Sequence, residues 1–242
     1  MDIRNLAEDI LVRRRTLSPR QRYLVGIAGI PASGKSFVAH RIREEINALV
    51  DTPVCAILPM DGCHLRRSEL KLDELAIRGN PCTFNAALFA KTVLRLKDIS
   101  NVIDAPIFDH ALQDPVERGV TIGYGETIVL IEGLYTFLPD WKIHGLAPSI
   151  FDMRLFIHAP RSIVESRIIN RHVHSGICKD NQEALRRWHM NDLPNGLLVI
   201  ESIEKMQSTN SIIDYIIINL DHSNMLTQSL NDIALGLAEF RL

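Results

Sequence analysis

Gly29-Ile30-Pro31-Ala32-Ser33-Gly34-Lys35-Ser36 decides the fold class of this chain. The stretch reads G-x-x-x-x-G-K-S, the pattern of a phosphate-binding P-loop when a strand precedes it and a helix follows it. Residues 23–28 form a short apolar run that suits a buried strand. After the loop, apolar residues recur as on one face of a helix: Val38, Ile42, Ile46 and Leu49. This order disfavours the alternative of a glycine-rich turn with an unrelated lysine.

Each part of this loop suits the binding of a triphosphate. Gly29 and Gly34 let the backbone turn tightly and direct its N–H groups inward. The following helix adds unpaired N–H groups and the positive end of its dipole. Lys35 can reach the β- and γ-phosphates, and the Ser36 hydroxyl can ligate Mg²⁺. We therefore predict an ATP-binding loop made of Gly29, Ile30, Pro31, Ala32, Ser33, Gly34, Lys35, Ser36 and Phe37.

The composition is that of an ordinary globular protein. The 242 residues are 46% hydrophobic and 23% charged, enough for one α/β core. Lysine and arginine total 27 against 29 acidic residues, so bulk charge suggests neither nucleic acid nor a membrane surface as a partner. No signal-peptide core or membrane-length apolar run occurs, and no C-x-x-C spacing links the cysteines. We expect a single cytoplasmic domain over residues 1–242, with free thiols.

Short apolar runs alternate with helical patterns along the chain. Further buried strands are predicted at residues 54–58, 127–131, 153–157 and 212–218, and helices at residues 2–17 and 225–241. Residues 65–97 are predicted to be mainly helical with a break at 79–81, and residues 102–124 to form an irregular excursion or a small hairpin. A long helical region is expected between the last two strands, interrupted at Pro194 and Gly196. The pattern predicts an α/β P-loop NTPase fold with a five-stranded, mostly parallel sheet flanked by helices.

Several short motifs occur in an order typical of one group of small-molecule kinases. They are Gly26-Ile27-Ala28-Gly29 with the P-loop, Pro59-Met60-Asp61-Gly62-Cys63-His64, Arg78-Gly79-Asn80-Pro81-Cys82-Thr83-Phe84-Asn85, Ala105-Pro106-Ile107-Phe108-Asp109-His110, Val129-Leu130-Ile131-Glu132-Gly133, Arg167 through Arg171-His172, and Asn191-Asp192-Leu193-Pro194-Asn195. The chain thus resembles the uridine kinase, phosphoribulokinase and pantothenate kinase group. Within it, the chain is most similar to the uridine-kinase-like branch associated with nucleosides, nucleotides or fructose transport. The resemblance implies a helical lid at about residues 161–196 and an acceptor-side excursion at about 62–124.

Three positions depart from the pattern of that group. Cys63 stands where an aromatic residue is usual, Asn85 replaces a usual aspartate, and His110 replaces a usual arginine. All three lie on the expected acceptor side, so they leave the phosphate chemistry untouched and the identity of the acceptor open. A guanine-reading N-K-x-D motif does not occur, which argues against a GTPase.

Two carboxylates follow predicted strands near the loop. Asp61 matches the acidic position that the group uses beside the acceptor, and we predict that it orients or deprotonates the acceptor hydroxyl. Asp-Gly is also ordinary turn chemistry, so a surface turn is the alternative. Glu132 can hold the water shell of Mg²⁺ beside Ser36, the alternative being a helix N-terminal charge or a turn residue.

The predicted lid supplies the remaining cations. Arg167 and Arg171 lie four residues apart and match the lid arginines of the group, whose guanidinium forks suit spread phosphate charge. We predict that they act in catalysis, with a solvated helix face as the alternative. Asn191, Asp192 and Asn195 match the helix after the lid. They close the adenine or lid region or have a structural role at a helix end. His172 and His174 are counted as lid residues, because no ligand cluster supports a metal site there.

Loop residues on the acceptor side are candidates for substrate contacts. We assign His64, Asp109 and His110 to this role, although His64 can equally be a hydrogen-bonded loop histidine and Asp109 can cap a turn. The sequence therefore predicts an ATP- and Mg²⁺-dependent kinase acting on a nucleoside or sugar-like hydroxyl acceptor. The alternative is a nucleotide-binding regulatory or sensing protein without efficient kinase activity. The oligomeric state is left open, with a homodimer as one possibility.

Overall fold

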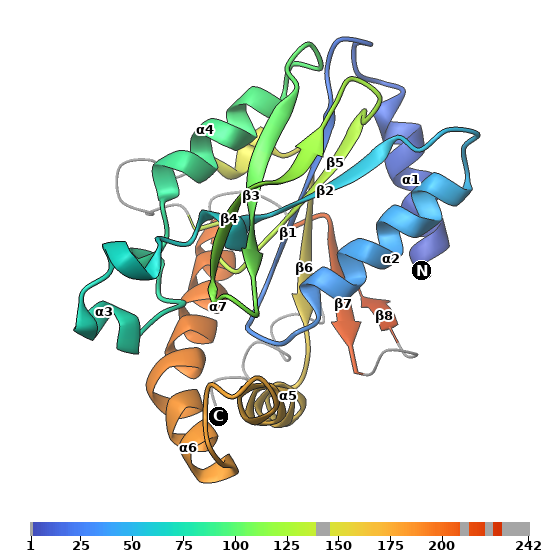
Figure 1. Ribbon diagram of the computed structural model, residues 1–242. Coiled ribbons are helices and arrows are strands. Elements are labelled where there is room, and N and C mark those ends of the chain that lie inside the picture. The colour runs from blue at the N-terminus through green and yellow to red at the C-terminus, as the bar shows by residue number, and fades with distance from the viewer. Residues whose placement is uncertain (1, 139–145, 209–212, 221–224, 229–242) are drawn as a thin grey trace.

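A six-stranded sheet in the order β2-β5-β1-β6-β7-β8 forms the centre of the molecule (Figure 1). The structure is a computed structural model that describes residues 2–138, 146–208, 213–220 and 225–228. Five of its strands are parallel: β1 (Tyr23–Gly29), β2 (Cys55–Pro59), β5 (Ile128–Glu132), β6 (Met153–His158) and β7 (Tyr215–Asn219). The predicted P-loop NTPase fold and its parallel sheet are confirmed.

The edge strand β8 (Met225–Gln228) corrects one prediction. Its residues were predicted to begin a helix over 225–241, but they pair antiparallel with β7. An open sheet edge presents unpaired N–H and C=O groups, and pairing with them outweighs a short helical pattern. The rest of that predicted helix lies outside the described residues.

Helices cover both faces of the sheet and bury a core on each side (Figure 1). Successive residues of β1 alternate between the two faces. Val25 and Ile27 pack with α1 (Ile3–Arg14) and α2 (Lys35–Ala48), whereas Leu24 and Ala28 pack with α4 (Ala86–Leu96) and α7 (Leu193–Ser208). Burial on both faces explains why β1 and β5 are continuous apolar runs.

The predicted acceptor-side excursion is a chain of short elements. After β2 come three 3₁₀ turns and two helices: η1 (Met60–Cys63), η2 (Arg67–Glu69), α3 (Leu72–Ala76), η3 (Pro81–Thr83) and α4. Then β3 (Ile103–Asp109) and β4 (Asp114–Ile122) pair as a separate antiparallel hairpin, which confirms the hairpin alternative. Residues 65–97 are helical only in α3 and α4, because loop segments and 3₁₀ turns separate them.

The predicted lid region consists of α5 (Arg161–His174), α6 (Asn181–Arg187), a π-helical turn (Trp188–Asp192) and α7. The predicted interruptions at Pro194 and Gly196 are wrong, because α7 contains both residues. Pro194 is the second residue of α7, directly after the π turn. The i→i+5 hydrogen bonds of that turn make room for the proline ring and its missing N–H.

Arg22 links the start of β1 to the turns at the amino-terminal ends of the parallel strands. Its side chain is fully buried and donates to the main-chain oxygens of six residues: Leu96, Asp98, Ile99, Asn101, Gly123 and Glu126. Burial lowers the pKa of Arg22, since no carboxylate side chain bonds to it among the described residues. No helix in the described part of the chain is long and apolar enough to cross a membrane.

Candidate active site

The P-loop lies at the carboxyl end of β1, between the ends of β5 and β6. Its two outer glycines are required by close approaches of the chain. A Cβ atom on Gly29 would overlap the main-chain oxygen of Ile157, and a Cβ on Gly34 would overlap the side chain of Asn219. Gly34 also has a φ of 93°, in the left-handed region that side chains rarely adopt. The loop therefore keeps the tight, glycine-dependent path that cradles a phosphate chain.

Lys35 is the first residue of α2 and its side chain folds back over the loop. The Nζ atom donates to the main-chain oxygen of Ile30 at 3.1 Å. Burial lowers the pKa of Lys35, and the negative charges of Glu132 and Asp61 oppose that shift. The ammonium group is thus within electrostatic reach of both carboxylates.

Glu132 is the last residue of β5, and its carboxylate forms a hydrogen bond with the Ser36 hydroxyl. The Ser36 hydroxyl donates to Oε1 of Glu132 at 2.9 Å. Glu132 is only 7% exposed, and its burial raises its pKa to about 7. The charge of Asp61 contributes to this rise, whereas Lys35 and the Ser36 hydrogen bond oppose it. A hydroxyl and a carboxylate at the end of a strand are the donor types that Mg²⁺ prefers, so these residues fit the predicted metal.

Asp61 comes to this cluster through the register of the sheet. Pro59, the last residue of β2, pairs with Glu132, and Asp61 follows two residues later in η1. The turn is held close to the hairpin, because a Cβ on Gly62 would overlap the main-chain oxygen of Pro106. The structure therefore brings Asp61, Lys35 and Glu132 together, although they are far apart in the sequence.

The two predicted lid arginines are related to the P-loop in different ways. Arg167 donates through Nη1 to the main-chain oxygen of Ala32 at 3.3 Å, and through Nη2 to that of Leu220 at 3.1 Å. Arg171 is exposed, and its positive charge helps to lower the pKa of Lys35. Arg167 thus links the loop to the residue after β7, whereas Arg171 is exposed within electrostatic reach of Lys35.

His64 lies next to Asp61 in a cluster of rings. Its Nδ1 donates to the main-chain oxygen of Asp61 at 2.8 Å, and its ring lies 3.8 Å from that of Phe84 and 4.8 Å from that of Phe108. Burial lowers the pKa of His64. The backbones of His64 and Phe84 also pair in an isolated β-bridge, and a substrate contact for His64 stays a prediction.

The other two predicted acceptor residues lie at the tip of the hairpin. Oδ1 of Asp109 accepts the N–H groups of Ala111 and Leu112, and these bonds lower its pKa. Asp109 therefore does cap a turn, as in the alternative to a substrate role. The ring of His110 packs edge-on against Phe108 at 5.3 Å. A substrate contact for Asp109 and His110 stays a prediction.

Two residues with no role predicted from the sequence support the predicted acceptor side. The Arg78 guanidinium donates to the main-chain oxygens of Leu65 and Gln113 and to Asp114, and its Cζ lies 5.3 Å from the centre of the Phe108 ring. The Tyr135 hydroxyl donates to the main-chain oxygen of Gly79 at 2.7 Å. Arg78 belongs to a quoted motif, but Tyr135 carries no sequence signal, because its role depends on a contact across 56 residues.

Asn191 and Asn195 form hydrogen bonds with the loop at residues 78–80. Asn191 donates to the main-chain oxygen of Arg78 at 3.0 Å, and Asn80 donates to Asn195 at 3.4 Å. Nε2 of His172 bonds to Asp192 at 2.9 Å in a buried pair. Within the described part of the chain, no group of three or more histidine, cysteine or acidic residues could hold a metal ion.

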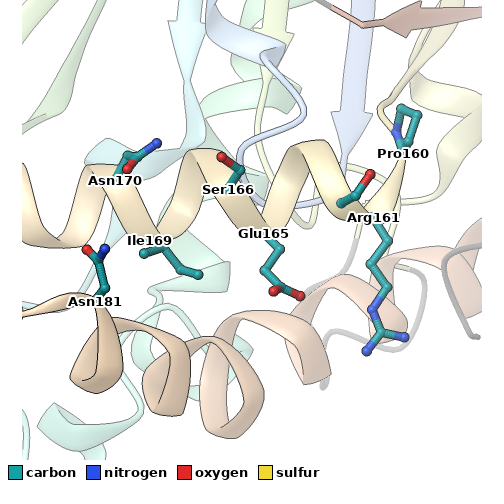
Figure 2. Close-up of a pocket in the computed structure, with 8 residues that line it drawn as sticks. Pro160, Arg161, Glu165, Ser166, Ile169, Asn170 and Asn181 are labelled. Carbon is teal, nitrogen blue, oxygen red and sulfur yellow. The ribbon is translucent and has the colours of Figure 1, made fainter.

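A pocket of about 680 Å³ runs along α5, away from these contacts (Figure 2). Figure 2 shows Asn181 at the start of α6 facing α5, with the other labelled residues on α5 or just before it: Pro160, Arg161, Glu165, Ser166, Ile169 and Asn170. Ser162 of α5 also lines the pocket. Neither the two lid arginines nor Lys35, Asp61 and Glu132 line this pocket. The candidate site is therefore defined by hydrogen bonds and charge rather than by this pocket.

Comparison with known proteins gives relatives with kinase names. The chain is 33% identical over 205 residues to a Schizosaccharomyces pombe protein called "Putative uridine kinase", with 81% of this chain and 84% of that protein covered. It is 28% identical to a "putative fructose transport system kinase" from Silicibacter of known structure, with a TM-score of 0.71 and coverage of 82% and 94%. The structure of YFH7 from Saccharomyces cerevisiae gives the same TM-score at 20% identity, over 91% and 99% of the two chains, and supports the fold alone. No family model matches the chain.

Proposed function

Because the chain belongs to the P-loop kinase family that includes this Schizosaccharomyces pombe relative, we propose that it transfers the γ-phosphate of ATP to a hydroxyl of a nucleoside or sugar-like acceptor. The observation that carries the proposal is the meeting of Lys35, Glu132 and Asp61 at the P-loop. Phosphoryl transfer depends on positioning and on neutralising charge, and these three groups supply both.

The loop binds the triphosphate through its backbone and its lysine. Free N–H groups of the loop and of the start of α2 would face the phosphates, and the Lys35 ammonium would contact the β- and γ-oxygens. Arg167 keeps the loop in shape from behind, and Arg171 adds positive charge where the transferred group becomes more negative. Only the second of these two arginines then acts directly on the transferred group.

Ser36 and Glu132 would hold Mg²⁺. Their oxygens are 2.9 Å apart, and the Ser36 hydroxyl keeps its lone pairs free while it donates to the carboxylate. When bound, the ion neutralises charge on the β- and γ-phosphates and orients them. Since Glu132 is buried and already bonded to Ser36, it is poorly placed to receive a proton from the acceptor.

Asp61 remains as the group that orients or deprotonates the acceptor. It is half-buried, lies on the acceptor side of Glu132, and is followed by the cluster of His64, Phe84 and Phe108. A hydroxyl placed between this carboxylate and the γ-phosphate would be aligned for in-line attack, and its proton would pass to Asp61. The rings beside it would contact the rest of the acceptor.

The alternative is nucleotide binding without efficient transfer, and it rested on the three departures from the family pattern. The structure accounts for two of them. Asn85 caps α4 by accepting the N–H of Leu88 at 2.9 Å, as an aspartate would, and Cys63 is 5% exposed and packs in the core. Only His110 is left as a change at an exposed acceptor position, so we favour the kinase.

A coupled assay of ADP release tests the proposal. Purified protein is incubated with Mg·ATP and a panel of nucleosides, sugars and pantothenate, and the Lys35→Ala variant serves as the background control. We expect release above background with at least one nucleoside or sugar. Saturable ATP binding with no acceptor-stimulated release across the panel would instead support the regulatory alternative.

A further inference from the structure

Three elements form hydrogen bonds with the 77–81 loop. From the π turn, Asn191 donates to the main-chain oxygen of Arg78 at 3.0 Å. From α6, Arg187 reaches the same oxygen at 3.4 Å, and from the segment after β5, Tyr135 donates to the oxygen of Gly79. Gly79 has a φ of 104°, so this conformation depends on the contacts around it as well as on the glycine.

The π turn also contacts the helix that carries the lid arginines. His172 follows Arg171 on α5, and its Nε2 donates to Oδ2 of Asp192 at 2.9 Å. The two side chains belong to residues only 4% and 8% exposed. A charge-assisted hydrogen bond in such a buried position is stronger than one at the surface and fixes the geometry of both partners. The carboxyl-terminal half of α5 is therefore tied to the π turn.

Two consecutive residues of the π turn contact two different neighbours, the 77–81 loop and α5. Side chains that follow each other on a helical turn point in different directions, so Asn191 and Asp192 can face different elements. Asn191 faces the 77–81 loop and Asp192 faces α5. Beyond the loop, the Arg78 side chain donates to the main-chain oxygen of Leu65, the residue after His64. A series of hydrogen bonds thus connects His172, next to Arg171, with Leu65, next to His64.

We propose that the His172–Asp192 pair is a positioning contact that couples nucleotide binding at the P-loop to the order of the 77–81 loop. The proposal rests on the nucleotide-binding part of the proposed function. Bound phosphates attract Arg171 and restrict the end of α5, and the buried pair passes this restriction to the π turn. Asn191 then fixes the loop beside the acceptor before the acceptor arrives. Neither His172 nor Asp192 touches a reacting atom.

Hydrogen exchange followed by mass spectrometry tests this coupling without any acceptor. We expect saturating Mg·ADP to slow exchange in the wild type both at residues 29–37 and at residues 77–84. In Asp192→Ala the slowing at 29–37 persists, but that at 77–84 falls by about fivefold or more, in the usual range of coupling between sites. Asp192→Asn restores it, because the amide oxygen still accepts from Nε2 of His172.

Two further variants separate coupling from damage to the fold. His172→Phe keeps a buried ring without the hydrogen bond and should lose the same loop response as Asp192→Ala. Glu165→Ala removes a carboxylate from α5 that contacts neither the π turn nor the loop in any described hydrogen bond, and should keep the full response. Unchanged exchange in β1 and β5 without ADP shows that each variant is folded.

The outcomes distinguish this inference from its premise. Slowing at 77–84 that persists undiminished in Asp192→Ala and His172→Phe would overturn the coupling. So would a wild type that responds at 29–37 but not at 77–84. A wild type that responds at neither segment would overturn nucleotide binding, and the coupling with it.

Discussion

Asp61 and Glu132 are both carboxylates near Lys35, and their surroundings give them different tasks. Glu132 is buried and bonded to Ser36, whereas Asp61 is half-buried beside His64. We expect Asp61→Asn to lower kcat by about 10²–10⁴-fold with little change in the KM for ATP, since it removes the group that takes the proton. Glu132→Gln should instead raise the Mg²⁺ concentration needed for half-maximal rate. Steady-state ADP release with the acceptor found in the panel measures both. A wild-type kcat in Asp61→Asn would assign the base elsewhere.

Gly34 shows how a single missing side chain shapes the phosphate site. We expect Gly34→Ala to abolish measurable ADP binding and to cost about 1–3 kcal/mol of unfolding free energy. The new methyl group would sit at positive φ and collide with Asn219, which itself donates to the oxygen of Ser33. Calorimetric titration with Mg·ADP and urea unfolding measure the two effects. Gly125→Ala is the matched control, because a Cβ there meets nothing within 4 Å and should leave both unchanged. Normal ADP affinity in Gly34→Ala would show that the loop tolerates a wider path.

Among the elements, the helix cap of α4 connects a sequence departure with stability. Asn85 accepts the N–H of Leu88, so Asn85→Ala should lower the unfolding free energy by about 1 kcal/mol, whereas Asn85→Asp should be nearly neutral. Urea unfolding followed by circular dichroism compares the three proteins. The same pair of variants can be assayed for ADP release. A large change in acceptor preference in Asn85→Asp, without a change in stability, would mean that this side chain reaches the substrate after all.

The elements also show which parts of the fold could be predicted. The five parallel strands could be predicted because each is a short apolar run buried by its neighbours, and the P-loop because its glycines, lysine and serine have fixed spacing. The strand state of β8 comes from its pairing with β7, and no local pattern marks it. The π turn was missed because one extra residue per turn leaves no sequence trace. Arg78 and Tyr135 support the site only through long-range contacts.

For the whole molecule, Arg22 tests how the turns at the amino-terminal ends of the parallel strands are held together. Its guanidinium satisfies main-chain oxygens from the end of α4, from residues 98–101 and from the turn before β5. A lysine has three donors on a single nitrogen and cannot reach this spread of acceptors. Arg22→Lys therefore leaves buried carbonyl groups without donors as well as a poorly solvated charge.

We expect Arg22→Lys to lower the unfolding free energy by about 3–5 kcal/mol, as for a broken buried charge arrangement, and Arg22→Met to cost a comparable amount. Urea unfolding of the two variants measures the loss, and Arg20→Lys is the control, since residue 20 is exposed. The site lies at the opposite end of β1 from the P-loop, so the folded fraction should still bind Mg·ADP with unchanged affinity. A loss below about 1 kcal/mol in Arg22→Lys would mean that water or backbone rearrangement satisfies these carbonyls. Arg22 would then contribute little to the free energy that holds β1 and the neighbouring turns together.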